Sequence, residues 1–432
     1  MNNLFFAAAR YLRAAGVDAH LFLFNDAASH FHPSKDTFNS DFESYTTELP
    51  FGLWQTFATT PVDAIAKATR GFDFLIGTGA APALVHRAGR KLDIYQPYGE
   101  DLVNFPFWLG FPRSRALLSA ATLPRHQRAG IRESSVILGL PSPRDEALYA
   151  KLGRIQGKRV ISQMPMLCNF EFSDEKLPTY FDRSVHYKRF KELRDSADLL
   201  VWNHSRICIE KTVNYKGTEK LIDGFAMFVA QNPGVRAKLA IFEYGPDQEA
   251  ARAQIAARDL GAHVAWLPLM PRKEVLLGLS FADVAIGELG YSWLLGGAIT
   301  ECMAMGKPMI HYRNDADFSK EHLYPLLPAS TPADVAAQLE RWMTDRDAVI
   351  EAGRGAKRYI DDLADSSMDV VKALIEEKRR FGRVDASTID PKLIIPIGAP
   401  GPIPSGGDAL ANSIDSAKAR LRALLPWRRR RA

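Results

Sequence analysis

The segment GELGYSWLLGGAITECMAMGKPMIHY, residues 287–312, contains the features that most strongly indicate the fold. It follows the apolar, β-rich run FADVAI, passes through two adjacent glycines into the helix-like ITECMAM, and ends at Gly306-Lys307-Pro308 before a second apolar run. Such a junction is typical of the carboxyl edge of a parallel sheet, where the amide groups of a helix N-terminus can bind an anion. The lone carboxylate of Glu301, one turn into that helix, can accept hydrogen bonds from the same ligand.

The same alternation of strand and helix extends from this segment in both directions. Longer segments with helical spacing, at 6–16, 218–233 and 247–261, separate the apolar runs and end on Gly or Asn-Pro. This alternation predicts parallel sheets covered by helices on both faces. Because the runs form two series, we expect an α/β fold of two doubly wound, Rossmann-like domains that face each other across a cleft. The expected strands are 18–24, 72–77, 91–96, 134–140 and 158–164 in the first series, and 199–204, 237–245, 263–269, 282–288 and 307–312 in the second.

The charged, helix-like stretch 183–198 separates the two series. We therefore expect an N-terminal domain at 1–190, a C-terminal domain at 191–365 and a helix at 366–380 that crosses back to the N-terminal domain. Residues 381–432 form a C-terminal extension, which begins as a Pro/Gly-rich linker containing IIPIGAPGPIPSGG and ends as a basic tail. The first series opens on a helix-like segment, so either its first strand is missing or the fold tolerates its loss.

Composition excludes several classes of protein. The 432 residues are 47% hydrophobic and 24% charged, which is typical of a globular chain and not of a disordered one. No apolar run reaches the length of a membrane span, and no signal peptide is visible. The cysteines Cys168, Cys208 and Cys302 lie far apart without a CxxC pair. We expect buried thiols in a reducing cytoplasm, and neither a zinc site nor another metal site.

The positive charge is concentrated at the C-terminus. The chain carries a net charge of +5, but residues 414–432 contain seven Lys or Arg residues against Asp415 alone. The remainder is close to neutral, which disfavours a nucleic-acid-binding body. Residues 414–431 combine helical apolar spacing with an arginine run. They are compatible with an amphipathic helix on an anionic membrane surface, which would make the protein peripheral to the membrane, and equally with a solvated, disordered tail.

The loops expected at the carboxyl edge of the second sheet carry charge suited to a diphosphate. NHSRICIEKTVNYKG, residues 203–217, follows the strand LLVW and brings Arg206 and Lys216 to that edge. Gly296 and Gly297 open the Glu301 helix, whose carboxylate can bind ribose hydroxyls in the way that the acid of a dinucleotide fold does. His204 is interpreted as structural or solvated. The other loops of this edge supply the remaining predicted donor-binding residues Tyr244, Gly245, Leu269 and Trp293.

These motifs resemble the group 1 (family 4) retaining glycosyltransferases of the GT-B fold. NYKGTEKLIDGFAMF is similar to that family's Lys-Gly motif and its following helix, and ITECMAMGKPMI to its Glu-Ala-Met-Ala-x-Gly-x-Pro signature. In the first half, FDFLIGTGAAP, IYQPYGEDL and NLFFAAARYLRAAGVDAHLFLF resemble elements of the acceptor domain. The resemblance covers roughly residues 2–375 and is strongest at 198–312.

The resemblance implies transfer of a sugar from a nucleotide-sugar donor to a glycan, lipid-linked or other acceptor, with retention of anomeric configuration and without a metal or other cofactor. It assigns neutralisation of the leaving diphosphate to Arg206 and Lys216, and ribose binding to Glu301. On the acceptor side it implicates Tyr98, Glu100 and Asp101, and the remnant of a glycine-rich loop at Asn2 and Asn3. The pair Glu100 and Asp101 is explained equally well as an acidic cap of its own loop.

Departures from the family pattern leave other functions open. Many members carry a second Glu eight positions before the last, where this chain has Trp293, and Glu288 lies nearby but out of register. Tyr98 stands where many members have His, and Thr78-Gly79 replaces the usual acceptor-domain His. The alternatives are another GT-B enzyme, such as an epimerase or a phosphorylase, and a catalytically weak nucleotide-binding partner in glycan assembly.

Overall fold

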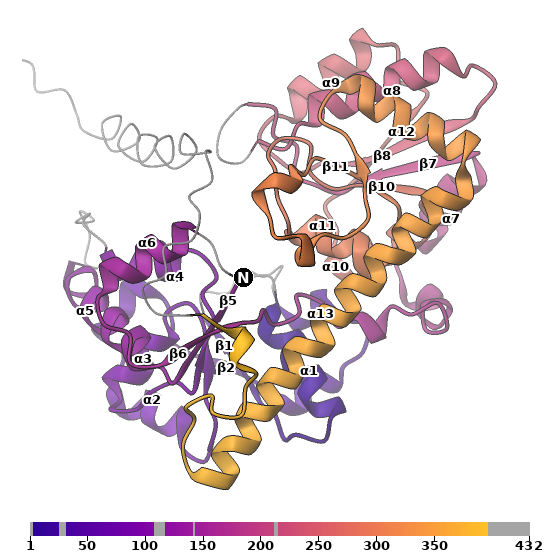
Figure 1. The fold of residues 1–432 in the computed structure, drawn as a ribbon. Helices are drawn as coiled ribbons and strands as arrows, with labels where there is room; N and C mark the ends of the chain where they lie inside the picture. Colours follow the sequence, from indigo (N-terminus) through magenta and orange to yellow (C-terminus); the bar gives the residue numbers. More distant parts are fainter. Residues whose placement is uncertain (1–2, 26–31, 108–116, 141–142, 211–214, 396–432) are drawn as a thin grey trace, which may run out of the picture.

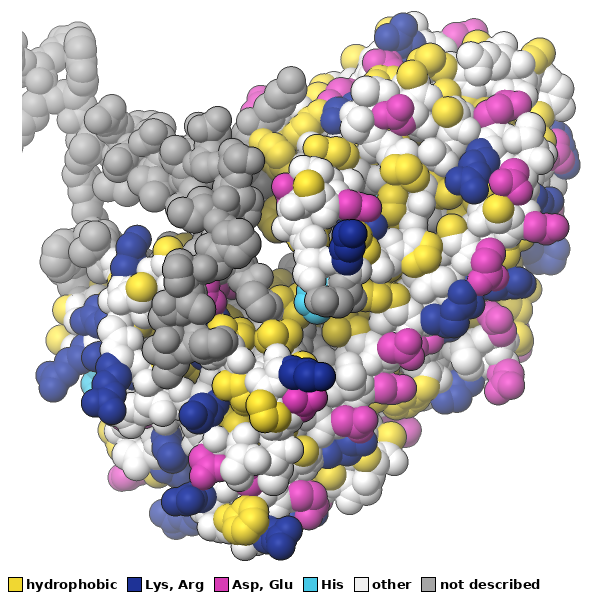
Figure 2. Space-filling view, in the orientation of Figure 1, with side chains coloured by type: hydrophobic (Ala, Val, Ile, Leu, Met, Phe, Trp, Pro, Cys, Tyr) yellow, Lys and Arg dark blue, Asp and Glu magenta, His cyan; other side chains and the backbone are white. Residues whose placement is uncertain are grey.

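The computed structural model describes residues 3–25, 32–107, 117–140, 143–210 and 215–395, and it consists of two Rossmann-like α/β domains (Figure 1). The fold is therefore the expected GT-B arrangement. Each domain has a mainly parallel sheet with helices on both faces, and the long helix α13 runs from one domain to the other (Figure 1). Lys and Arg side chains are interspersed with Asp and Glu over the visible face of both domains (Figure 2).

The C-terminal domain is built on a six-stranded parallel sheet with the order β12-β11-β10-β7-β8-β9. Its first strand, β7, is central and buried at all five positions, because side chains of alternate residues face two separate cores. The strands are β7 (Leu199–Asn203), β8 (Ala237–Phe242), β9 (Val264–Leu267), β10 (Val284–Ile286), β11 (Met309–His311) and β12 (Leu327–Pro328). The helices are α7 (Tyr187–Asp195), α8 (Thr218–Gln231), α9 (Gln248–Ala257), α10 (Arg272–Ser280), α11 (Gly297–Ala304) and α12 (Pro332–Thr344).

The strand order of this sheet reverses between β7 and β10. The chain proceeds from β7 to β8 and β9 on one side, and from β10 to β11 and β12 on the other. In doubly wound sheets the ligand crevice lies at the carboxyl ends of the strands that flank such a reversal. The first residue after β7 is His204, and Glu288 comes two residues after the end of β10. The topology therefore predicts a ligand crevice at the loops that contain these two residues.

The N-terminal domain has a divided sheet. Strands β1 (Leu21–Phe24) and β2 (Thr46–Leu49) form a parallel pair, and the other strands form a second sheet with the order β13-β6-β5-β4-β3. The ring of Phe22 in β1 lies 5.2 Å from the ring of Phe72, which precedes the second sheet. The second sheet comprises β3 (Ile76–Gly77), β4 (Ile94–Tyr95), β5 (Val136–Gly139), β6 (Lys158–Ile161) and β13 (Ile394–Ile395). The helices are α1 (Leu4–Ala14), α2 (Val62–Thr69), α3 (Ala81–Arg87), α4 (Glu100–Val103), α5 (Leu117–Glu133) and α6 (Pro143–Leu152).

The helix expected at 366–380 is the C-terminal half of one continuous helix, α13 (Arg346–Phe381). Its first half packs Val349 and Ala356 on the C-terminal domain, and its second half packs Val371 and Leu374 on the N-terminal sheet. The boundary drawn near residue 365 was wrong as a helix end, since no Gly or Pro there interrupts the helix and Ala364 is buried. Through α13, one rigid element contacts both domains.

The segment after α13 also departs from its expected role as a linker. Gly382 ends the helix with a φ of 69°, and the chain then returns to the N-terminal sheet, where β13 pairs antiparallel with β6. Val384 and Ile389 are buried in the core beneath. Residues 382–395 therefore belong to the N-terminal domain. The rest of the predicted linker and the whole predicted amphipathic tail lie outside the described residues.

Among the helices that the structure describes, none has both the length and the apolar character needed to cross a membrane.

Candidate functional site

Backbone contacts join the three loops at the carboxyl edge of the C-terminal sheet. The Ile207 N–H group donates to Tyr244 O at 2.7 Å, and the Leu289 N–H group donates to Lys216 O at 3.0 Å. Two glycines permit this approach. Gly245 has a φ of 128°, and a Cβ atom there would lie 2.1 Å from Ile207 O. Gly217 has a φ of 71°, and a Cβ atom there would lie 2.6 Å from the carbonyl carbon of Leu289.

Lys216 forms an ion pair inside this edge. Its Nζ lies 2.5 Å from Glu288 Oε1, and the side chain of Glu288 is buried. The other carboxylate oxygen of Glu288 has no hydrogen-bond partner among the described residues. A Cβ atom on Gly296, which precedes helix α11, would lie 3.5 Å from Glu288 Oε1. The predicted cation, an acid that the sequence did not assign and the helix N-terminus are therefore adjacent.

Glu301 lies within the first turns of α11 and is 8% exposed. Its Oε2 is 2.8 Å from His204 Nε2, and its Oε1 is 2.8 Å from Arg272 Nε. Burial opposes ionisation, but the charge of Arg272 and hydrogen bonds from His204 and Arg272 outweigh it and lower the pKa of Glu301. The site thus holds an ionised carboxylate. The interpretation of His204 as merely structural or solvated missed this contact.

Arg272 connects Glu301 to the N-terminal domain. It is the first residue of α10, and its Nη1 lies 3.1 Å from Asp36 Oδ2 and 3.4 Å from Met166 O. The two carboxylates raise the pKa of Arg272 despite its burial, whereas burial raises the pKa of Asp36 despite the charge of Arg272. Sequence reasoning singled out the loop that contains Arg272 but named neither Arg272 nor Asp36. Their separation along the chain left no local pattern to detect.

Among the predicted acceptor residues, Asp101 is buried and bound to groups of its own domain. Its carboxylate accepts hydrogen bonds from Thr78 Oγ1 and Tyr95 OH, and from the backbone amides of Gly79, Tyr98 and Gly99 at 2.7–3.1 Å. These contacts fix two loops and leave the side chain 3% exposed. Of the two explanations for this acid, the geometry supports the loop cap.

The remaining acceptor-side residues lie in different environments. Tyr98 is 40% exposed. Burial of its phenol group raises the pKa of that group, and the charge of Arg272 opposes this rise. Glu100 is exposed at the start of α4. Asn3 is buried at the start of α1 with a φ of 53°. Its side chain opposes the rise that burial causes in the pKa of Asp36. Asn2 lies outside the described residues.

The donor-side residues are likewise spread over several environments. Arg206 is half-buried in the loop after β7, and Gly297 is the first residue of α11. Tyr244 is 39% exposed, Leu269 62% and Trp293 44%. The Trp293 carbonyl accepts a hydrogen bond from Nε2 of the buried His311 at 2.8 Å, which ties the loop before α11 to β11.

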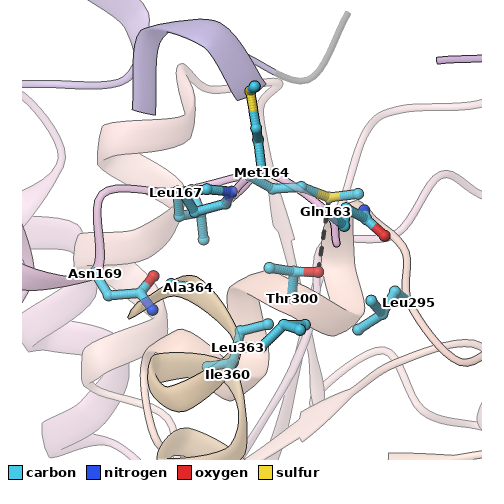
Figure 3. A pocket seen from close by; sticks show the side chains of 11 residues that line it. Gln163, Met164, Leu167, Asn169, Leu295, Thr300, Ile360, Leu363 and Ala364 are labelled. Atoms are coloured by element: carbon cyan, nitrogen blue, oxygen red, sulfur yellow. Dashed lines mark hydrogen bonds between the residues drawn. The ribbon is translucent and has the colours of Figure 1, made fainter. Parts of the chain in front are cut away.

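A small cavity of about 20 Å³ is lined by Thr300 of α11, by residues of α13 and by residues 163–169 (Figure 3). The Thr300 hydroxyl points to Met166 Sδ at 3.7 Å, across the junction of the two domains (Figure 3). This volume holds about one water molecule, so the junction here is closely packed. Within the described part of the chain, no group of three or more His, Cys, Asp or Glu residues is placed to hold a metal ion. Cys168, Cys208 and Cys302 are buried, and none of the three forms a disulfide.

Comparisons with known proteins show similarity at the level of the fold. No protein-family model and no curated protein sequence matches the chain. The structure of Alr3699/HepE from Anabaena in complex with UDP and glucose is similar over 87% of this chain and 95% of that one, with 14% identity and a TM-score of 0.53. The MnaA–UDP structure from S. aureus is similar over 87% of this chain and 92% of that one, with 9% identity and a TM-score of 0.50.

Proposed function

We propose that the chain is a glycosyltransferase that moves a sugar from a nucleotide-sugar donor to a glycan, lipid-linked or other acceptor. The observation that carries this proposal is the ionised, buried Glu301, held by His204 and Arg272 where the strand order of the C-terminal sheet reverses. Similar folds bind UDP and glucose in HepE and UDP in MnaA, which supports a nucleotide as the ligand class. The motifs shared with the group 1 enzymes support sugar transfer as the reaction.

In the proposed donor complex, the diphosphate lies at the N-terminus of α11, where free backbone amides favour an anion. Arg206 supplies positive charge for the leaving nucleoside diphosphate, so that stabilisation of its developing charge drives the reaction without a metal ion. Glu301 accepts hydrogen bonds from the ribose hydroxyls. The acceptor lies on the N-terminal domain near Tyr98, and the anomeric configuration is retained.

Lys216 has a different part in this proposal from the one that the sequence suggested. Its ion pair with Glu288 places a cation and an anion together beside α11, so its charge is partly neutralised. Lys216 then orients Glu288 as well as facing the diphosphate. This pairing also favours one second candidate: a nucleotide-binding partner in glycan assembly, in which weakened cationic character leaves binding without turnover.

Thermal-shift measurements with UDP, GDP, ADP, dTDP and their sugar conjugates test the nucleotide site. One nucleotide should raise the melting temperature of the wild type, and most of that rise should disappear in Glu301→Gln and Arg206→Gln. Glu100→Gln, which changes an exposed acid outside the donor site, is the matched control and should keep the full rise. An unchanged rise in Glu301→Gln would contradict the proposal.

Turnover separates the two candidate functions. The enzyme should release nucleoside diphosphate from its sugar conjugate in the presence of a suitable acceptor extract, and NMR of the product should show the anomeric configuration of the donor. A partner protein would bind the same nucleotide and release none.

The three buried cysteines are compatible with a reducing compartment, and we propose a cytoplasmic location for the reaction.

A further inference from the structure

One guanidinium group connects carboxylates from the two domains. Arg272 directs Nε to Glu301 Oε1 in its own domain, at 2.8 Å, and Nη1 to Asp36 Oδ2 of the N-terminal domain, at 3.1 Å. All three side chains are at most 12% exposed. Because burial removes the screening by water, this arrangement is much more strongly coupled than an ion pair on the surface.

The segment that carries Asp36 is anchored on the C-terminal domain. Phe38, two residues further on, is buried in a core cluster that includes Leu267 and Met270 of that domain. The ammonium group of Lys273 lies 5.1 Å from the centre of the Phe38 ring. The packing of Phe38 therefore holds Asp36 against the start of α10.

The geometry leaves Glu301 with capacity for a ligand. A carboxylate can accept about four hydrogen bonds, and His204 and Arg272 each use one oxygen here. Arginine has five N–H donors in a planar fork, which suits it to bind both oxygens of one carboxylate. Loss of the Asp36 carboxylate would remove one of the two charges that hold the guanidinium, so that it could turn toward Glu301 and occupy the lone pairs that ribose hydroxyls would use.

We propose that Arg272 is a positioning residue of the nucleotide site and that Asp36 fixes its orientation from the opposite domain. Nucleotide affinity then depends on an N-terminal residue that does not touch the nucleotide. This inference rests on the proposed function, because it requires Glu301 to bind a nucleotide. It goes beyond that function in assigning part of donor binding to contact between the domains.

Calorimetric titration of the full chain tests the coupling. UDP, GDP, ADP and dTDP are titrated into the wild type, and the tightest of them is the probe for Asp36→Asn, Arg272→Gln and the double variant. We expect Asp36→Asn to raise the Kd about 5- to 10-fold. In the Arg272→Gln background, the same change should alter the Kd less than about 2-fold. A residue that only stabilises the fold would not show this dependence on Arg272.

Asp93 provides a matched control. It is a buried N-terminal carboxylate whose oxygens lie 2.7 and 2.8 Å from Lys378 Nζ, far along the chain from Asp36. Asp93→Asn should lower the melting temperature but leave the Kd within about 2-fold of the wild type. Asp36→Glu, which keeps the charge, should recover affinity. If Asp36→Asn does not fold, Arg272→Lys replaces it, since an ammonium group cannot bridge two carboxylates as the fork does, and a 5- to 10-fold loss is again expected.

The outcomes separate the two proposals. If the wild type binds nucleotide and Asp36→Asn binds it equally well, or if the effects of Asp36→Asn and Arg272→Gln simply add, the coupling is wrong and the nucleotide site stands. In the lysine arm, an unchanged Kd overturns the coupling. If the wild type binds none of the four diphosphates, the proposed function fails and the coupling fails with it.

Discussion

Lys216 Nζ lies 2.5 Å from Glu288 Oε1, and the side chains of the two residues are 19% and 8% exposed. This pair joins the loop after β7 to the loop after β10, on either side of the point where the strand order reverses. A charge in such a place is stabilised mainly by its partner, so loss of either one leaves the other buried and uncompensated.

We therefore expect Lys216→Ala to lower the free energy of unfolding by about 3 kcal/mol, as removal of one partner of a buried pair generally does. The double variant Lys216→Met with Glu288→Leu should be closer to the wild type, because no charge is left unpaired. Urea unfolding measures both. Lys191→Ala breaks an exposed pair with Asp195 and should change little. A double variant less stable than Lys216→Ala would show that the pair contributes more than charge compensation.

Gly245 and Gly217 should be intolerant of a side chain. An alanine at either position requires a strained positive φ and brings its Cβ within 2.1 to 2.6 Å of backbone atoms of a neighbouring loop. We expect each Gly→Ala change to cost more than about 2 kcal/mol and to abolish nucleotide binding, because the loops must separate. In Gly261→Ala the new Cβ meets no atom within 4 Å, so this control should be close to neutral. Chemical unfolding of the three variants compares them.

Asp101 offers a test of the loop-cap interpretation. Replacing it by Asn keeps one acceptor oxygen but turns an NH₂ group toward donors, so several of its five hydrogen bonds fail. We expect Asp101→Asn to cost about 2–4 kcal/mol. Hydrogen exchange should accelerate at the amides of Gly79, Tyr98 and Gly99. Glu100→Gln should do neither. A stable Asp101→Asn variant with a specific defect in acceptor use would instead restore the acceptor-binding role.

The predicted strands appear where the sequence placed them, because each is a short apolar run between polar segments and burial on two faces requires that pattern. The prediction that residues 382–395 form part of a linker was wrong, because it relied on local composition alone. Local composition suggested a break, whereas Ile394 and Ile395 pair with the edge strand β6, a partner more than 200 residues away. No window of sequence contains that information.

The same distinction applies to the site. The position of Glu301 at the carboxyl edge of the sheet was predictable, because it depends on the adjacent glycines and on the helix that they open. Its partners were not, since Arg272 lies 236 residues from Asp36 along the chain and the two meet only in the tertiary structure. Contacts of this kind depend on the packing of segment 36–38 against α10, which periodicity does not encode.

Lys307 should make stability depend on pH in a defined window. It is buried, its Nζ donates to Ser280 O and Ala282 O, and burial lowers its pKa from 10.5 to about 8. Between these values the unfolded chain binds a proton that the native state has released, so the native state gains stability as pH rises. Relative to Lys307→Met, the wild type should gain up to about 1.4 kcal/mol per pH unit from pH 8 to 10. Urea unfolding across this range measures the difference, and parallel curves would mean that Lys307 stays protonated.

Residues 414–431 lie outside the described part of the chain. Their apolar spacing and arginine run should bind anionic membranes, with each basic residue near the surface contributing about 1 kcal/mol. The full chain should co-sediment with vesicles of phosphatidylcholine and phosphatidylserine at low salt and dissociate as salt is raised. A chain ending at Ile395 keeps β13 and should stay folded but lose this binding. Replacing all four residues Arg428–Arg431 by Gln distinguishes binding through charge from binding through apolar insertion. Equal binding to neutral vesicles would contradict an electrostatic anchor, and no binding to either would favour the solvated tail.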